Sequence, residues 1–157
     1  MLQYIISFII LISVVVFVHE YGHYYFAKKY KVGVTDFSIG FGKELFGFND
    51  RDGTRWKICA IPLGGYVKFF GDSNSASQPT SLSKIDSKDH SKLLTTKPLY
   101  QRSIIVSAGP FANFILAIFI FSIIFMTVGK DVTVPVITEV QKNSPATQAG
   151  LKSNDQI

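Results

Sequence analysis

The sequence contains a single cysteine, Cys59, among its 157 residues. One cysteine cannot form an intrachain disulfide, and it cannot supply the paired cysteines of a zinc-ribbon scaffold. Charged residues are absent from two long stretches, 2–18 and 103–129, which are rich in Ile, Val and Phe. With their flanks, these stretches can each supply the roughly 20 apolar residues that a membrane-spanning helix needs. The sequence therefore predicts a mainly α-helical membrane protein with two spanning helices.

The first apolar stretch also lacks the features of a cleaved signal peptide. No Lys or Arg precedes it, and no small-x-small cleavage site follows it. A signal peptide has both features, so a permanent spanning helix is the better interpretation.

The distribution of charge predicts the orientation of the chain. The net charge of +5 would suit a nucleic-acid partner, but the basic residues are concentrated between the two apolar stretches. Residues 28–102 contain 13 Lys and Arg against 7 Asp and Glu, whereas residues 130–157 contain 3 of each. By the positive-inside rule the central segment is cytoplasmic and both chain ends are extracytoplasmic. The excess of basic residues is thus explained by the orientation of the chain in the lipid bilayer, and no nucleic-acid partner is expected.

The first apolar stretch ends in HEYGH, residues 19–23, which is an H-E-x-x-H pattern. Residues four apart share one face of a helix, so His19 and His23 can bind one Zn²⁺ while Glu20 acts as general base on the attacking water. Bound zinc lowers the pKa of its water toward about 7 and polarises a carbonyl, which permits amide hydrolysis at neutral pH. The alternative is a chance match formed by ordinary core histidines, with a probability of roughly one per cent or less at average residue usage.

The position of this pattern in an apolar segment supports the metal hypothesis. Lys28 lies about 13 Å along a helix from His19, which puts the pattern in the cytoplasmic half of the bilayer. Two imidazoles and a carboxylate are costly in hydrocarbon unless a cation and water compensate them. We therefore expect a metal site inside the membrane.

A third protein ligand, which catalytic zinc usually has, is not evident in the sequence. The second apolar stretch contains no Asp, Glu, His or Cys, and Asp131 lies at its extracytoplasmic end. His90 lies in a polar segment where a solvated side chain is expected, and a lone cysteine such as Cys59 is usually a small buried side chain. The sequence supplies two ligands, His19 and His23.

Composition divides the rest of the chain. A Gly-rich segment with partial apolar alternation and an NDRDG turn signal predicts a hairpin or small sheet. A following segment rich in Ser, Lys and Asp predicts a flexible tether. The expected segments are a first spanning helix at 1–27, a β-like segment at 28–70, a tether at 71–101, a second spanning helix at 102–129 and a tail at 130–157.

Five ordered motifs resemble the site-2 family of intramembrane zinc metalloproteases, and within it the regulator of sigma-E protease type. They are HEYGH at 19–23, FSIGFG at 37–42, IPLGGYVK at 61–68, QRSIIVSAGPFANF at 101–114 and SPATQAGL at 144–151. The resemblance implies a multi-pass protein of the bacterial inner membrane that cleaves a single-span regulatory protein, such as an anti-sigma factor.

The resemblance also implies roles for individual residues in the metal site. His19 and His23 would bind one zinc per chain, and Glu20 would activate water. The third ligand would be an Asp on a later helix, beyond residue 157, so these 157 residues would be an N-terminal fragment that is inactive in isolation. The sequence-based alternatives are a non-catalytic metal-binding scaffold and, with more spans, a transporter.

For substrate binding the resemblance implies a membrane re-entrant β-hairpin around Gly64, Gly65 and Tyr66, and a substrate contact by Asn113. It further implies that a PDZ-like domain begins near Val132. The residues themselves leave alternatives open. Gly64 and Gly65 could form a simple turn, and an Asn inside a spanning helix often only hydrogen-bonds to a neighbouring helix.

Overall fold

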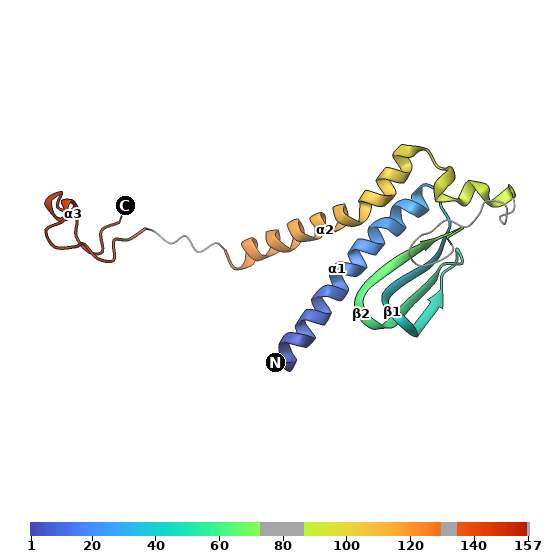
Figure 1. Ribbon diagram of the computed structural model, residues 1–157, viewed down its shortest axis with the longest axis horizontal. Coiled ribbons are helices and arrows are strands. Elements are labelled where there is room, and N and C mark those ends of the chain that lie inside the picture. Colours follow the sequence, from blue (N-terminus) through green and yellow to red (C-terminus); the bar gives the residue numbers. More distant parts are fainter. Residues whose placement is uncertain (73–86, 130–134, 157) are drawn as a thin grey trace. The chain divides into compact units, whose positions relative to one another are not determined.

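The computed structural model describes residues 1–72, 87–129 and 135–156 (Figure 1). Its longer elements are α1 (Leu2–Lys29), β1 (Val34–Asn49), β2 (Arg55–Phe69) and α2 (Leu99–Thr127), and its short helices are η2 (Ser87–Lys92), η3 (Leu94–Thr96) and α3 (Pro145–Gln148). The chain divides into two compact units, Met1–Ile120 and Phe121–Ile157. Residues 73–86 of the expected tether, and the expected domain start at Val132, lie outside the described residues, while η2, η3 and the first residues of α2 lie within the segment predicted as a tether.

The two expected apolar helices are present as α1 and α2. Both are long and apolar enough to cross a membrane, and both leave large apolar side chains exposed, such as Phe8 on α1 and Phe114 on α2. The core helix of a water-soluble protein would bury such a surface, so this exposure suits hydrocarbon surroundings. Lys28 and Lys29 form the last turn of α1, where cations complement the helix dipole.

Strands β1 and β2 form the expected hairpin, a two-stranded antiparallel sheet. The turn between them is closed by Asp50, whose Oδ1 accepts hydrogen bonds from the backbone N–H groups of Asp52 and Thr54 at 2.9 and 2.8 Å. Gly53 supplies the positive φ of 83° that this turn requires. The NDRDG signal in the sequence is therefore explained by an Asx turn.

Both strands curve strongly, and β1 pairs with two parts of β2 (Figure 1). Residues 36–39 have partners in 55–58 and also in 65–68, while 46–49 pair with the other side of 55–58. Gly40 has a φ of 87°, and a Cβ there would lie 2.8 Å from the carbonyl oxygen of Ile61. Only glycine fits this bend, which folds the hairpin over itself and leaves 65–69 at one edge.

The buried core lies where the end of α1 meets the hairpin and the first half of α2. Its cluster contains Ala27, Val32, Val34, Phe37, Val67, Phe69 and Ile105. Phe37 stacks on Trp56 with ring centroids 4.1 Å apart, which adds an aromatic pair to the apolar contacts. This core connects the helix that carries HEYGH to β2 on one side and to α2 on the other.

The second unit contains little regular structure within residues 135–156. Ser144 caps the single turn α3 by accepting a hydrogen bond from the Thr147 backbone N–H, and Pro145 occupies the first turn. An isolated β-bridge joins Val136 to Gln156. The SPATQAGL motif is thus a capped helical turn.

Candidate functional site

The two histidines of HEYGH lie on one face of α1, with ring centroids 4.9 Å apart. Their Nε2 atoms converge on Gly109 of α2. A Cβ on Gly109 would collide with Nε2 of His23 and would lie 2.8 Å from Nε2 of His19. The missing side chain of Gly109 therefore leaves a gap lined by two imidazole nitrogens, and we refer to it as the histidine gap.

The other ring nitrogens of both histidines face α2. Nδ1 of His23 lies 2.7 Å from the backbone carbonyl oxygen of Ile105. Nδ1 of His19 lies 3.3 Å from Nδ2 of Asn113. Because a carbonyl oxygen can only accept, the proton of neutral His23 resides on Nδ1, and its Nε2 presents a lone pair to the histidine gap.

The two Nε2 atoms of this arrangement are suitable ligands for a zinc ion, but they make up only part of a ligand set. Imidazole nitrogens are common zinc ligands, and an outward Nδ1–H bonded to a carbonyl is the usual support for an Nε2 ligand. Within residues 1–72, 87–129 and 135–156, no group of three His, Cys, Asp or Glu side chains could hold a metal. His19 and His23 would thus provide only two donors of a coordination shell.

Glu20 lies against β2. A Cβ on Gly65 would be 3.1 Å from Cγ of Glu20 and 2.8 Å from Cγ1 of Val16, so the strand passes α1 with no room for a side chain. The backbone of Val67 also hydrogen-bonds to the Glu20 carboxylate. Within the described residues, 65–69 of β2 pairs with β1 on one side only, and this part of the strand runs directly beside the acidic residue of HEYGH.

The remaining predicted site residues lie in the hairpin. Gly64 and Gly65 are inside strand β2, so the simple-turn alternative is wrong for both. A Cβ on Gly64 would collide with the ring of Phe41, and Tyr66 stacks on the same ring at 6.1 Å between centroids. Phe41 thus covers one side of this glycine pair.

Comparison with known proteins assigns the family. Residues 7–154 match the model of peptidase family M50. The chain belongs to peptidase family M50. This is the site-2 protease family that the sequence motifs indicate, and its members are membrane proteases.

Individual relatives of this M50 chain agree with that assignment. The chain is 49% identical over 156 residues to an Agrobacterium fabrum protein and 48% identical over 156 residues to a Mesorhizobium japonicum protein, both named "putative zinc metalloprotease". It is 40% identical over 163 residues to metalloprotease MmpA of Caulobacter vibrioides. Each match covers 98% of this chain and 41 to 42% of the relative's length.

Two polar residues considered from the sequence do not join His19 and His23 in a metal-binding group within the described residues. Cys59 is buried, and its Sγ lies 3.3 Å from Oγ of Ser38. His90 lies in η2. Asp131 is outside the described residues.

Sequence reasoning missed part of the contact between α1 and α2. A Cβ on Gly22 would lie 2.5 Å from the carbonyl oxygen of Ala108 and 3.0 Å from Cβ of Ala112. Gly22 and Gly109 therefore both permit the close approach of the two helices, one from each side. The available signal was a glycine inside each helix, which costs about 1 kcal/mol relative to alanine and so suggests close packing.

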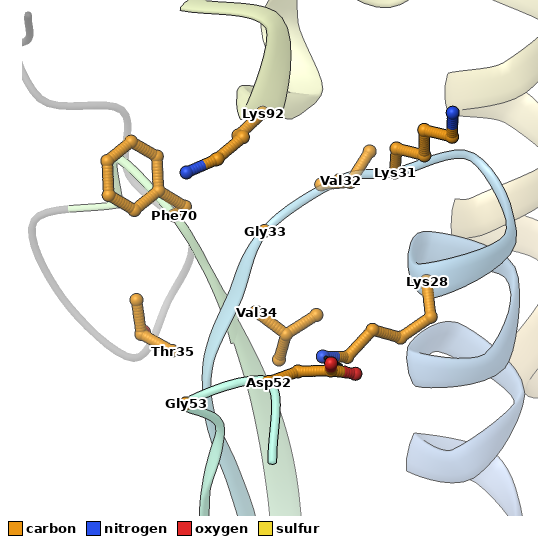
Figure 2. Close-up of a pocket in the computed structure, with 10 residues that line it drawn as sticks. All are labelled: Lys28, Lys31, Val32, Gly33, Val34, Thr35, Asp52, Gly53, Phe70 and Lys92. Carbon is orange, nitrogen blue, oxygen red and sulfur yellow. Dashed lines mark hydrogen bonds and ion pairs between the residues drawn. The ribbon is translucent and has the colours of Figure 1, made fainter. Parts of the chain in front are cut away.

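A separate hollow of about 410 Å³ lies where α1, the hairpin and η2 come together (Figure 2). Its basic residues include Lys28 and Lys92, which pair with Asp52 and Asp89 at 2.9 and 2.8 Å. Figure 2 shows Lys28 and Asp52 side by side at its wall. Two of the three lysines that line the hollow therefore have carboxylate partners, and within the described residues only Lys31 is left without an ion pair, which is too little for the converging cations of an anion site.

Proposed function

We propose that this chain forms the N-terminal part of a zinc-dependent intramembrane endopeptidase that cleaves a single-span membrane regulatory protein, such as an anti-sigma factor. The observation that carries the proposal is the convergence of two imidazole Nε2 atoms on the histidine gap, while Glu20, the residue after His19 on α1, lies against β2. The M50 family and the names of the relatives support the metalloprotease class. The third zinc ligand is proposed to be an Asp beyond residue 157.

The residues of this chain have separate roles in the proposed reaction. When bound, zinc supplies a coordinated water of lowered pKa and polarises the scissile carbonyl. Glu20 takes the proton from the attacking water and returns it to the departing amine as a general acid. His19 and His23 hold the metal on one face of α1.

The edge of β2 is proposed to hold the substrate. A peptide bond inside a helix is shielded by its own hydrogen bonds, so the substrate has to be extended before hydrolysis. The segment around Gly64, Gly65 and Tyr66 lies beside Glu20, where an added strand could bind through its backbone. Asn113 is a candidate for a further substrate contact.

The setting of the site completes the proposal. We propose that the protein resides in the bacterial inner membrane, with both ends of this chain extracytoplasmic and the hairpin re-entering from the cytoplasmic side. The tail from Val132 would begin a PDZ-like domain. A non-catalytic metal-binding scaffold is the second candidate, because only two ligands come together within the described residues.

The test is Glu20→Gln in the complete protein, assayed for cleavage of a single-span reporter in reconstituted membranes and for zinc in the same sample. Gln retains the size of Glu but cannot act as a base, so the rate should fall about 10²- to 10⁴-fold while zinc is retained. Glu139→Gln, at an exposed position, is the matched control and should cleave normally. Near-normal cleavage by Glu20→Gln would remove this residue from the reaction, whereas zinc binding without any cleavage by the unchanged protein would favour the scaffold.

A further inference from the structure

One polar atom beside the histidine gap is buried and unsatisfied. Oδ1 of Asn113 has no hydrogen-bond partner among the described residues, while Nδ2 of the same side chain lies 3.3 Å from Nδ1 of His19. An unsatisfied buried oxygen costs about 1–3 kcal/mol. The amide of an Asn can exchange its oxygen and nitrogen by a half-turn about χ2, with almost no change in shape.

The two orientations of this amide have opposite consequences for His19. If Nδ2 donates to Nδ1, the proton of the neutral imidazole must reside on Nε2, and that nitrogen cannot bind a metal. If Oδ1 faces the ring instead, Nδ1 carries the proton and donates it to the amide oxygen. Nε2 of His19 then presents a lone pair to the histidine gap.

The second arrangement is the one that His23 already has. Its Nδ1 lies 2.7 Å from the carbonyl oxygen of Ile105, an acceptor that cannot donate. Ile105 and Asn113 are eight positions apart on α2, and His19 and His23 are four apart on α1. Both acceptors therefore come from the facing helix, one from its backbone and one from a side chain.

We propose that Asn113 is a positioning residue, whose side-chain oxygen accepts the Nδ1 proton of His19 and so keeps Nε2 free for the metal. This inference rests on the proposed zinc site. It assigns Asn113 a function toward this chain's own histidine that is separate from any contact with substrate. The backbone carbonyl of Ile105 does the same for His23, and no side-chain substitution can remove it.

The test measures zinc affinity of the complete protein in detergent, by competition with a chromophoric chelator. Leu in Asn113→Leu has a similar size but no hydrogen-bond acceptor, so zinc should bind about 10- to 100-fold more weakly. Losses of this size are typical when a residue that hydrogen-bonds to a metal ligand is removed. Asn113→Asp can only accept at this position, and its carboxylate should restore affinity to at least the original value. Ser107→Ala, on the same helix with its hydroxyl bonded to Ser103, is the control and should bind normally.

The outcomes separate this inference from the proposed function. If His19→Ala binds zinc as tightly as the unchanged protein, the zinc site itself is wrong. If His19→Ala loses zinc while Asn113→Leu does not, only the positioning function is overturned. Weak binding by both Asn113→Leu and Asn113→Asp would also overturn it, because that pattern fits an amide that donates. Asn113→Ala replaces the Leu variant if circular dichroism shows that Leu disturbs the helices.

Discussion

Helices α1 and α2 are alike in length and apolar character, with 28 and 29 residues, but they make different contributions to the site. α1 carries His19, Glu20 and His23, whereas α2 contains no Asp, Glu, His or Cys. α2 instead leaves space at Gly109, which has no side chain, and provides a hydrogen-bond acceptor, the backbone carbonyl oxygen of Ile105. One helix thus supplies the reactive groups and the other gives them space and orientation.

Because of this difference, substitutions on the two helices should affect the site in different ways. Most substitutions of a metal-binding histidine on α1 remove the ligand. The histidine gap, in contrast, is lost only when a substitution on α2 adds atoms that fill it. Substitutions that add a single methyl group therefore test the contribution of α2 and β2 without touching a reactive group.

The largest effect is expected for Gly109→Ala in the complete protein. The added Cβ would enter the histidine gap, collide with Nε2 of His23 and meet Nε2 of His19 at 2.8 Å. Overpacking should lower the free energy of unfolding by about 1–3 kcal/mol. Zinc affinity, measured by chelator competition, should fall by about 100-fold because the methyl group would crowd both Nε2 atoms that are proposed to bind the metal.

Gly22→Ala is the matched control for this substitution. Its Cβ would press on the carbonyl oxygen of Ala108 at 2.5 Å, so it overpacks the same pair of helices without entering the histidine gap. It should destabilise the protein to a similar degree and keep its zinc. Equal loss of zinc by the two variants would show that helix spacing, and not the gap at Gly109, determines metal binding.

A smaller effect is expected for Gly65→Ala in β2. The new Cβ would stand 2.6 Å from the carbonyl oxygen of Ser38 and 3.1 Å from Cγ of Glu20, so the strand must move away from α1. Small displacements of positioning groups can cost up to about 100-fold in rate, and about 10-fold is expected here. The cleavage assay should detect this loss while zinc content stays normal.

The control for the hairpin is Lys43→Ala, an exposed side chain of β1. It should cleave the reporter at the normal rate. If Gly65→Ala also cleaves normally, contact between β2 and Glu20 is not needed for the reaction.

The sequence predicted the elements better than the contacts between them. Uncharged apolar runs identify the two helices, and NDRDG with partial alternation identifies the hairpin, because these features depend on local composition and turn geometry. The spacing of HEYGH likewise predicted two imidazoles on one face of α1. Local sequence patterns thus predict the features that depend on a single helix or hairpin.

The histidine gap could not be predicted in the same way. It depends on which turn of α2 faces His19 and His23, and that choice is made by packing around Ile105 and Gly22. The pairing of residues 36–39 with two separate parts of β2 also depends on contacts between distant residues. The alternation of apolar and polar residues along a strand does not determine such pairing. The roles of Asn113 and Tyr66 toward a substrate remain predictions.

The smallest effect concerns an ion pair between β1 and β2. Nζ of Lys57 lies 2.6 Å from Oδ1 of Asp36. Partial burial acts to raise the pKa of Asp36, but hydrogen bonds from Lys57 and Thr35 and the charges of Lys57 and Lys68 outweigh it, so the pKa is lower than usual. The folded state therefore binds its proton more weakly than the unfolded chain does.

The resulting stabilisation is present above the unfolded pKa of about 3.9 and should be lost as pH falls through the lower folded pKa. Since the side chains of Asp36 and Lys57 are 21% and 15% exposed, the contribution should be only about 0.5–1 kcal/mol. Trp56, the single tryptophan, stacks on Phe37 in this hairpin and can report its unfolding by fluorescence. Asp36→Asn should be less stable than the unchanged protein at pH 7, and the difference should shrink toward pH 3. A difference that stays constant with pH would show that packing around Asp36, and not its charge, stabilises the hairpin.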